Sequence, residues 1–127
     1  MIVLDANIII AFVNPSDRHH QHAAELLEEH ASHGFQMHQL TLAEVLVGAV
    51  CTGRGSQLLN DLRSLGIVAH EPGASEPLIL AELRVTTGLR MPDCCVLAVA
   101  QLENVPLATF DQQLGRAAQK LRIPTVG

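Results

Sequence analysis

The sequence contains very few aromatic side chains and almost no lysine. Tryptophan and tyrosine are absent, only three phenylalanines occur, and Lys120 is the only lysine among eight basic residues. Proteins that hold single-stranded nucleic acid without sequence preference stack successive bases on aromatic platforms, so a platform of that kind is excluded. The other basic residues are arginines, which bind phosphate through two parallel hydrogen bonds. If the ligand carries phosphates, the sequence predicts that only a few of them are contacted.

Cysteines and long apolar runs are also scarce. The three cysteines are Cys51 and the adjacent pair Cys94 and Cys95, which form neither a disulfide framework nor a CxxC zinc pair. Unpaired cysteines are typical of a reducing compartment. No apolar run approaches the roughly 20 residues that span a bilayer, and residues 1–5 lack the basic start and apolar core of a signal peptide. We therefore expect a soluble, cytoplasmic protein without membrane contacts.

Length and charge favour one globular domain over residues 1–127. At 48% hydrophobic residues, a chain of this size buries roughly two-thirds of its unfolded surface without help from disulfides. The net charge is −5, from 13 acidic and 8 basic residues. Nucleic-acid-binding proteins are usually basic, so a broad electrostatic contact with RNA or DNA is disfavoured.

Strand-like and helix-like segments alternate along the chain. Predicted strands cover residues 1–4, 35–40, 67–69, 105–109 and 124–126, and helical patterns lie between them. Residues 7–13 could be strand or helix by composition, and the turn residues just before them favour a short helix. Ser16 or Asp17 is the predicted cap of the next helix, which runs through Ala31. The alternation predicts an α/β fold with a parallel, mostly five-stranded sheet and helices on both faces.

Four carboxylates lie at the ends of apolar segments, far apart in the sequence. They are Asp5 after the first strand, Glu44 after Thr41, Asp93 at the head of an apolar helix, and Asp111 after the fourth strand. Acids at such positions point into the crevice where α/β sheets bind ligands. Together they predict one acidic pocket that requires divalent cations, and setting these four aside leaves the rest of the chain at −1.

Each acid also has a simpler structural explanation. Asp5 can begin a turn, and Asp111 can cap the last helix. Glu44 completes a capping box with Thr41, and Asp93 suits the positive end of a helix dipole. Four independent explanations do not account for the shared placement at element junctions, so a common pocket is favoured.

The donor types favour a hard metal ion over zinc. Mg²⁺ and Mn²⁺ take oxygen ligands and retain several waters. Seven histidines are present, but none pairs with a cysteine at zinc-finger spacing. Surface exposure is the better interpretation for them, including His19, His22, His30 and His33. Cys94 and Cys95 lie in an apolar helix and are interpreted as core residues, because no histidine is placed to activate them.

The four acidic motifs resemble those of a known family. Asp5-Ala6-Asn7 after a short strand, Thr41-x-x-Glu44, the segment 89–93 ending in Pro92-Asp93, and the segment 106–111 ending in Phe110-Asp111 are similar to the PIN-domain ribonucleases. The small size resembles the VapC toxins of bacterial toxin–antitoxin pairs within that family. The resemblance implies that the strands before Asp5 and Asp111 are neighbours, which places both acids at the topological switch point.

The resemblance also implies an activity and partners. It implies a Mg²⁺- or Mn²⁺-dependent endoribonuclease that leaves 5′-phosphate and 3′-hydroxyl ends, with structured RNA such as tRNA among its targets. Asp5, Glu44, Asp93 and Asp111 are then the catalytic candidates, with Asp5, Asp93 and Asp111 as metal ligands and Glu44 holding waters or a second ion. A homodimer and a VapB-like antitoxin are the expected partners.

Four further residues are candidates around this site. Asn7 and Thr109 are expected to donate hydrogen bonds that orient the carboxylates, although Asn7 fits a turn equally well. Arg84 and Arg90 are candidate phosphate contacts, and they fit exposed helix-end arginines equally well. Ala6 replaces a small polar residue that many relatives carry. Phe110 is expected to pack beneath the site.

Other classes of protein fit less well. A haloacid-dehalogenase fold needs a second acid where Asn7 stands, and a receiver domain needs a lysine after a late strand, whereas Lys120 lies in the final helix. The alternative that remains is a non-catalytic PIN-fold module that binds other proteins. Such degenerate modules lose acids, and all four are present here.

Overall fold

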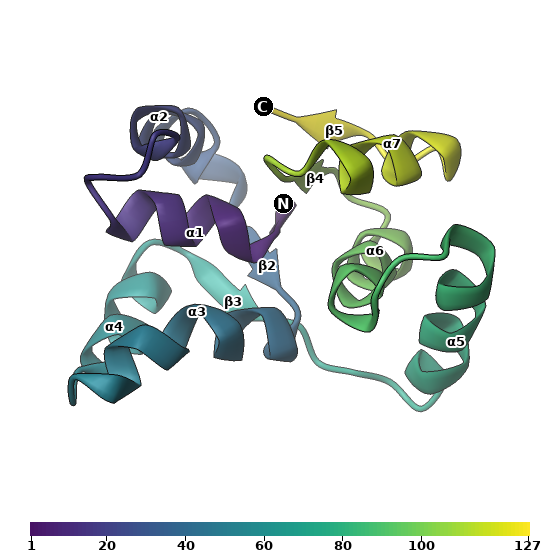
Figure 1. The fold of residues 1–127 in the computed structure, drawn as a ribbon, viewed down its shortest axis with the longest axis horizontal. Helices are drawn as coiled ribbons and strands as arrows, with labels where there is room; N and C mark the ends of the chain where they lie inside the picture. Colours follow the sequence, from purple (N-terminus) through teal and green to yellow (C-terminus); the bar gives the residue numbers. More distant parts are fainter.

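The computed structural model describes all 127 residues, and Figure 1 shows its helices arranged around one sheet. The strands are β1 (Ile2–Leu4), β2 (Phe35–Met37), β3 (Ile67–Ala69), β4 (Leu107–Ala108) and β5 (Thr125–Val126). The helices are α1 (Ala6–Val13), α2 (His20–Glu29), α3 (Gln39–Cys51), α4 (Gly55–Ser64), α5 (Glu76–Thr87), α6 (Met91–Glu103) and α7 (Gln112–Lys120), with a short 3₁₀ helix η1 at Ala31–His33.

The sheet is parallel throughout and has five strands in the order β3-β2-β1-β4-β5. The predicted α/β class and five-stranded parallel sheet are therefore confirmed. The chain reverses direction across the sheet between β1 and β4, and such switch points are where open α/β sheets bind ligands. Leu4 pairs with Ala108 in the register of β1 and β4. The residues that follow, Asp5 and Thr109, are therefore neighbours at the carboxyl edge.

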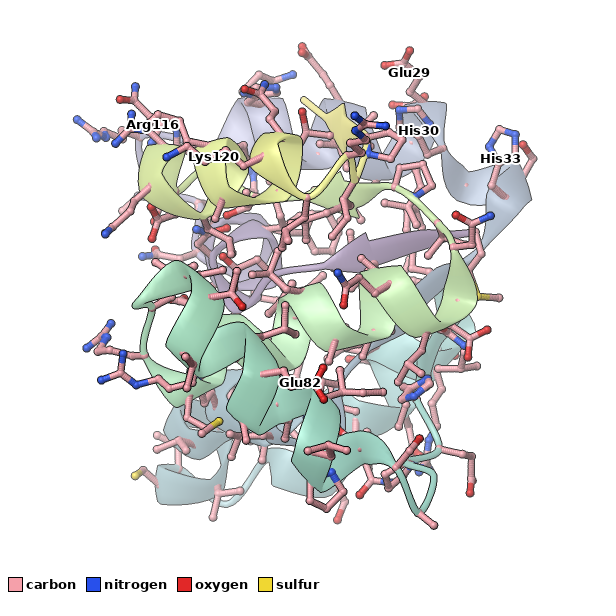
Figure 2. All side chains as sticks on the ribbon, turned by 90° about the vertical axis from the view of Figure 1, so that its right-hand side faces the viewer. Glu29, His30, His33, Glu82, Arg116 and Lys120 are labelled. Atoms are coloured by element: carbon pink, nitrogen blue, oxygen red, sulfur yellow. The ribbon has the colours of Figure 1, made fainter.

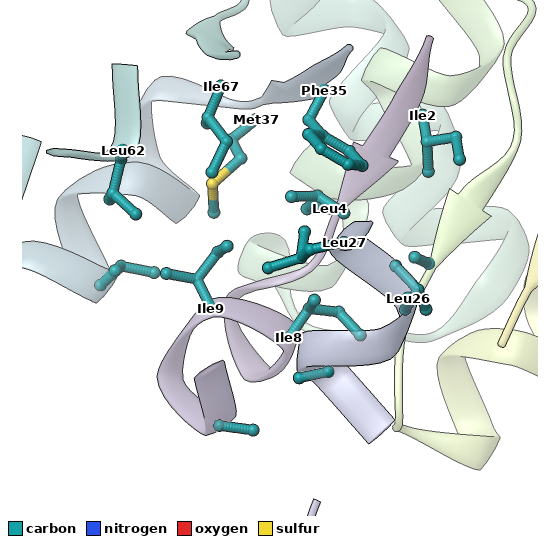
Figure 3. Close-up of a cluster of buried hydrophobic side chains, with 14 of the residues drawn as sticks. Ile2, Leu4, Ile8, Ile9, Leu26, Leu27, Phe35, Met37, Leu62 and Ile67 are labelled. Carbon is teal, nitrogen blue, oxygen red and sulfur yellow. The ribbon is translucent and has the colours of Figure 1, made fainter. Parts of the chain in front are cut away.

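Helices cover both faces of the sheet, each over its own apolar cluster. One face packs against α1–α4 and the other against α5–α7, on the left and right of Figure 1. Figure 3 shows the first cluster, where Leu4 and Phe35 from the strands meet Ile8 of α1. Burying each such side chain stabilises the fold by about 1.5–3 kcal/mol relative to leaving it exposed. Helix α6 is buried from Cys94 to Ala100, as its continuous apolar sequence predicted.

Side-chain caps begin the two helices nearest the switch point. Asp5 is the N-cap of α1, and its Oδ1 accepts a hydrogen bond from the Ala6 amide at 2.8 Å. Asp111 is the N-cap of α7, and its Oδ1 accepts from the amides of Gln113 and Leu114. Both caps satisfy amides that have no partner inside their helices. The capping explanation offered for Asp111 thus holds for one oxygen of its carboxylate, and Asp5, expected to begin a turn, caps its helix in the same way.

The predicted capping box at Thr41 is wrong. Helix α3 begins at Gln39 because His38 is its N-cap, with Nδ1 accepting from the Leu40 amide at 3.0 Å. Thr41 therefore lies inside the helix, where it is buried and its hydroxyl has no hydrogen-bond partner. Glu44 lies in the second turn and caps nothing. The predicted strand 35–40 is correspondingly shorter and ends at Met37.

The predicted cap of α2 is also wrong. Helix α2 begins at His20, and His19 precedes it without a side-chain cap. Asp17 instead closes a turn, where its Oδ1 accepts from the His19 amide at 2.8 Å. The helix ends at Glu29, and residues 31–33 continue as the 3₁₀ helix. Elsewhere, no helix has both the length and the apolar character to cross a membrane.

Candidate active site

Asp5 follows β1 directly and is held by two hydrogen-bond donors. Its Oδ1 accepts from the Ala6 amide at 2.8 Å, and its Oδ2 accepts from the Thr109 hydroxyl at 2.7 Å. Burial raises the pKa of the Asp5 carboxyl, and the nearby charges of Asp93 and Asp111 raise it further. The two hydrogen bonds favour the charged form and oppose that rise. Asp5 is thus oriented by donors but lies in an acidic environment.

Thr109 joins the two strands of the switch point. While donating to Asp5, its Oγ1 accepts from the Asp111 amide at 3.0 Å and from Asn7 Nδ2 at 3.3 Å. Asn7 Oδ1 in turn accepts from the Phe110 amide at 3.2 Å. Thr109 therefore orients a carboxylate directly, as expected, whereas Asn7 contacts no carboxylate and acts by positioning Thr109.

Asp93 and Asp111 complete a group of three interacting acids. Asp93 lies in the first turn of α6, and its carboxylate accepts no hydrogen bond from the protein. Burial raises the pKa of Asp93, the charge of Asp111 raises it further, and Arg90 lowers it. Asp111 is exposed, and only its Oδ1 has protein partners. Asp5, Asp93 and Asp111 come from three separate elements and act on one another electrostatically.

The chemistry of this group fits a hard divalent ion, although its geometry is open. The three carboxylates supply only oxygen donors, which Mg²⁺ and Mn²⁺ prefer. Few basic residues lie near them. No three His, Cys, Asp or Glu side chains lie close enough together in this structure to hold a metal ion between them. An open arrangement suits Mg²⁺, which keeps several of its waters and takes only one or two protein carboxylates in many sites.

Glu44 comes from α3 and interacts less strongly with Asp5 and Asp93 than Asp111 does. It is exposed on α3 and is absent from the charges that raise the pKa values of Asp5 and Asp93. Its charge reaches Cys95 near the start of α6, where burial and then the charges of Glu76, Cys94 and Glu44 raise the pKa of the thiol to about 11. Glu44 also lines a groove of about 570 Å³ between α1, α3 and α4.

The two candidate arginines differ in their relation to the acids. Arg90 precedes α6 as its N-cap residue and is exposed, and it is the base that lowers the pKa of Asp93. Arg84 is exposed on α5, and its charge acts on the buried Cys94 instead. Burial raises the pKa of Cys94 as well. Both adjacent thiols are therefore core groups, as the sequence indicated.

Two histidines that follow strands escaped the sequence interpretation. His38 follows β2 and His70 follows β3, and the register of Met37 with Ala69 makes them neighbours. His38 Nε2 contacts Glu76 Oε1, and both side chains are largely buried. His70 Nδ1 lies 3.3 Å from Glu103 Oε1 without the alignment of a hydrogen bond. Partners 38 and 33 residues apart leave no local signal that sequence patterns could detect.

Two more histidines lie next to the acids. The ring of His19 stacks on Phe110, with centroids 4.6 Å apart, and the ring of His22 tilts against Phe110 at 5.1 Å. Phe110 itself packs against the apolar cluster under α1 and α2, which agrees with its expected place beneath the site. His19 is half-buried, so the interpretation of both histidines as free surface residues was incomplete.

A parallel α/β sheet with acids at its switch point is typical of domains that bind a ligand there. Comparison with known proteins identifies the family of this domain. The PIN domain family matches residues 2–120. The chain belongs to the PIN-domain family. A search of curated proteins gives no significant match.

Solved structures with the same fold come from several bacteria. The chain is similar to a toxin–antitoxin complex from Klebsiella pneumoniae, with 23% identity, a TM-score of 0.68 and 87% of each chain covered. It is similar to FitAcB from Neisseria gonorrhoeae, with 20% identity, a TM-score of 0.73, and 100% and 97% of the two chains covered. VapC20 from Mycobacterium tuberculosis, described as a Sarcin-Ricin loop cleaving toxin, has 16% identity, a TM-score of 0.77, and 92% and 95% covered. At these identities the likeness establishes the fold.

Proposed function

We propose that this protein is a Mg²⁺- or Mn²⁺-dependent endoribonuclease, and that it acts as a VapC-type toxin neutralised by a cognate antitoxin. The observation that carries this proposal is the group of three acids at the switch point of a PIN fold. Burial and mutual repulsion raise the pKa values of Asp5 and Asp93, and Arg90 alone among the bases opposes this at Asp93. A divalent cation would relieve the repulsion.

Each acid has a role in the proposed site. Asp5, Asp93 and Asp111 would hold the metal ion, and Glu44 would hold further waters or a second ion. When bound, such an ion stabilises charge on the scissile phosphate and lowers the pKa of coordinated water. Thr109 fixes the Asp5 carboxylate through its 2.7 Å hydrogen bond, and Asn7 fixes Thr109. Arg90, exposed beside Asp93, is the better placed of the two arginines for a phosphate contact.

Cleavage of RNA tests the nuclease proposal. Purified protein should cut total RNA with Mg²⁺ or Mn²⁺, leaving 5′-phosphate ends, and EDTA should stop it. Asp93→Asn should lower the rate about a hundredfold or more, because it removes a carboxylate that no protein group can replace. Full activity in Asp93→Asn or in EDTA would contradict the proposal. The relative described as a Sarcin-Ricin loop cleaving toxin supports structured RNA as the substrate class.

The partners follow from the same likeness and from exposed apolar surface. Several relatives with this fold were solved as toxin–antitoxin complexes, which supports an antitoxin as a partner. Leu78 and Val85 of α5 are 64% and 86% exposed, and their spacing of seven residues places them on one helical face. We infer that the protein is cytoplasmic and forms a homodimer through this face.

Two experiments test these partners. Leu78→Glu should give a monomer in analytical ultracentrifugation. Coexpression with a neighbouring reading frame that encodes the antitoxin should relieve toxicity.

A non-catalytic PIN module that binds other proteins is the alternative. The two proposals differ in what a metal ion does, because a scaffold without catalysis has no need of an open acidic site. Calorimetric titration with Mn²⁺ separates them. A scaffold should give no heat that depends on Asp93, whereas the nuclease should give a saturable heat that Asp93→Asn abolishes.

A further inference from the structure

A second groove opens beside Asp111, between α2 and α7. It has a volume of about 430 Å³, which lies in the range of small-ligand sites, and only two of its lining residues are hydrophobic. Thr109 and Asp111 belong to its lining. A ligand in this groove would therefore contact the same Asp111 that interacts with Asp5 and Asp93.

One wall of the groove is aromatic and is formed by residues next to Asp111. Phe110 lies between Thr109 and Asp111, and the Asn7 side chain holds its amide at 3.2 Å. The rings of His19 and His22 lie against Phe110 at 4.6 and 5.1 Å, and all three rings line the groove. Imidazole rings stack on nucleobases and hydrogen-bond to them. His22 is exposed and is the ring best available to a ligand.

The opposite wall is a polar face of α7. Gln112, Arg116 and Gln119 line the groove at helical spacing and are exposed. Arg116 also lines a third groove, of about 400 Å³, which lies on the other side of α7 and includes Lys120 in its lining. Figure 2 shows Arg116 and Lys120 together on the outer side of α7. Arg116 thus lies between the two grooves and can contact a phosphate that passes from one to the other.

Gly115 adds to the open space of this groove. It lies in the middle of α7, where glycine costs about 1 kcal/mol relative to alanine. A Cβ added at Gly115 would meet no atom within 4 Å, and its φ is not in the left-handed region. Neither packing nor backbone conformation therefore requires glycine here. Gly115 lines the groove, and a side chain at this position would occupy the space of a ligand.

We propose that the groove between α2 and α7 binds a nucleotide of the RNA substrate next to the cleaved bond. His22 contacts its base, Arg116 contacts a phosphate, and Gly115 leaves room for the sugar and base. This proposal rests on the proposed nuclease function and adds the residues that position the RNA strand. None of the three takes part in the metal site, so they should govern RNA binding and leave the chemical step unchanged.

The test compares variants on one RNA. Total RNA is first cut by the wild type, and a fluorescein-labelled fragment spanning a mapped cut is then used to measure KM and kcat. Gly115→Leu should raise KM about tenfold or more by filling the groove. Arg116→Ala should raise KM about tenfold and lower the salt dependence of binding by about one ion. His22→Ala should raise KM about threefold to tenfold, since a stacked ring contributes roughly 1–3 kcal/mol.

Stability measurements separate binding from folding. Gly115→Ala and Gly115→Leu should leave the melting temperature unchanged or raise it, so a higher KM cannot come from unfolding. Arg63→Ala is the matched control, because Arg63 is exposed on α4, beside the opposite edge strand of the sheet. Unchanged KM in both Gly115→Leu and Arg116→Ala, with active wild type, would overturn the nucleotide site and leave the nuclease standing. A wild type that cuts no RNA would overturn the nuclease proposal itself.

Discussion

The carboxyl edge of the sheet has two halves, and the carboxylates in these halves have different partners. In the β2–β3 half, the residues that follow the strands are His38 and His70, and each meets a glutamate from α5 or α6. In the β1–β4 half, the residues are Asp5 and Thr109, and two further acids lie nearby. One half pairs each carboxylate with an imidazole, and the other groups carboxylates that repel one another.

The difference separates a paired structural cluster from the acids that we propose as the metal site. A buried carboxylate is costly unless it is paired and hydrogen-bonded, and Glu76 meets that condition through His38. Asp5 and Asp93 do not meet it, and burial raises their pKa values. Acids whose pKa values are raised by burial and by one another's charges are typical of functional sites. The fold therefore has acids that destabilise it at the switch point, and the stabilising pair of His38 and Glu76 at the other half of the same edge.

The largest effect is expected in the paired half. His38→Ala removes the donor to Glu76, which is only 5% exposed, and leaves that carboxylate buried without a partner. Leaving a buried charged acceptor without its hydrogen-bond partner costs about 3 kcal/mol or more. Because Nδ1 accepts from the Leu40 amide, Nε2 is the nitrogen that donates to Glu76. Urea denaturation of both proteins at pH 7 measures the loss.

His38→Asn separates the two roles of this histidine. Asparagine can still cap α3 by accepting from the Leu40 amide, but it is too short to donate to Glu76. We expect it to remain nearly as unstable as His38→Ala. Recovery of most of the stability would mean that the cap matters more than the pair, and the contrast between the two halves would weaken.

A smaller loss is expected where Thr109 joins β1 to β4. Thr109→Val removes the hydroxyl that donates to Asp5 and accepts from the Asp111 amide. Hydrogen bonds to charged groups contribute about 1.5–3 kcal/mol, and the pKa of Asp5 should rise further. Thr109→Ser keeps the hydroxyl and should restore most of the stability and cleavage activity. Equal loss in both variants would indicate packing of the methyl group instead.

Neutralising Asp93 should give a small gain in stability without metal. Its folded pKa is raised above 3.8, so its favourable contribution is complete only below the unfolded pKa and is lost as pH rises through the folded value. Asp93→Asn should therefore melt about 1–3 °C higher than wild type at pH 7.5, with the difference shrinking toward pH 4. A lower melting temperature at pH 7.5 would show that Asp93 is stabilised by its helix instead.

Asp5→Asn should behave less simply than Asp93→Asn. Both oxygens of Asp5 accept hydrogen bonds, from the Ala6 amide and the Thr109 hydroxyl. An asparagine offers only one acceptor, so the loss of one hydrogen bond offsets the relief of repulsion. Asp93 accepts no such bond and is the cleaner probe of the acidic group.

The sequence predicted the arrangement of elements better than the details of either cluster. Short apolar runs bounded on one side by Gly, Asp or Asn marked the strands. The resemblance of the motifs implied that the strands before Asp5 and Asp111 are neighbours. His38 was missed as a cap because Ser, Thr, Asp and Asn are the usual caps, and Thr41 with Glu44 imitated a capping box. The contact of His38 with Glu76 depends on how α5 packs, which no local pattern encodes.

Thermal stabilisation by Mn²⁺ tests most directly whether the unpaired acids form a metal site. At pH 7.5 and a hundredfold excess over Kd, a bound ion should stabilise the wild type by about 2.7 kcal/mol. Asp93→Asn should lose most of this response, and at pH 5 the wild-type response should shrink because protons compete for carboxylates with raised pKa values. Equal melting temperatures with and without Mn²⁺ at pH 7.5 would contradict the account.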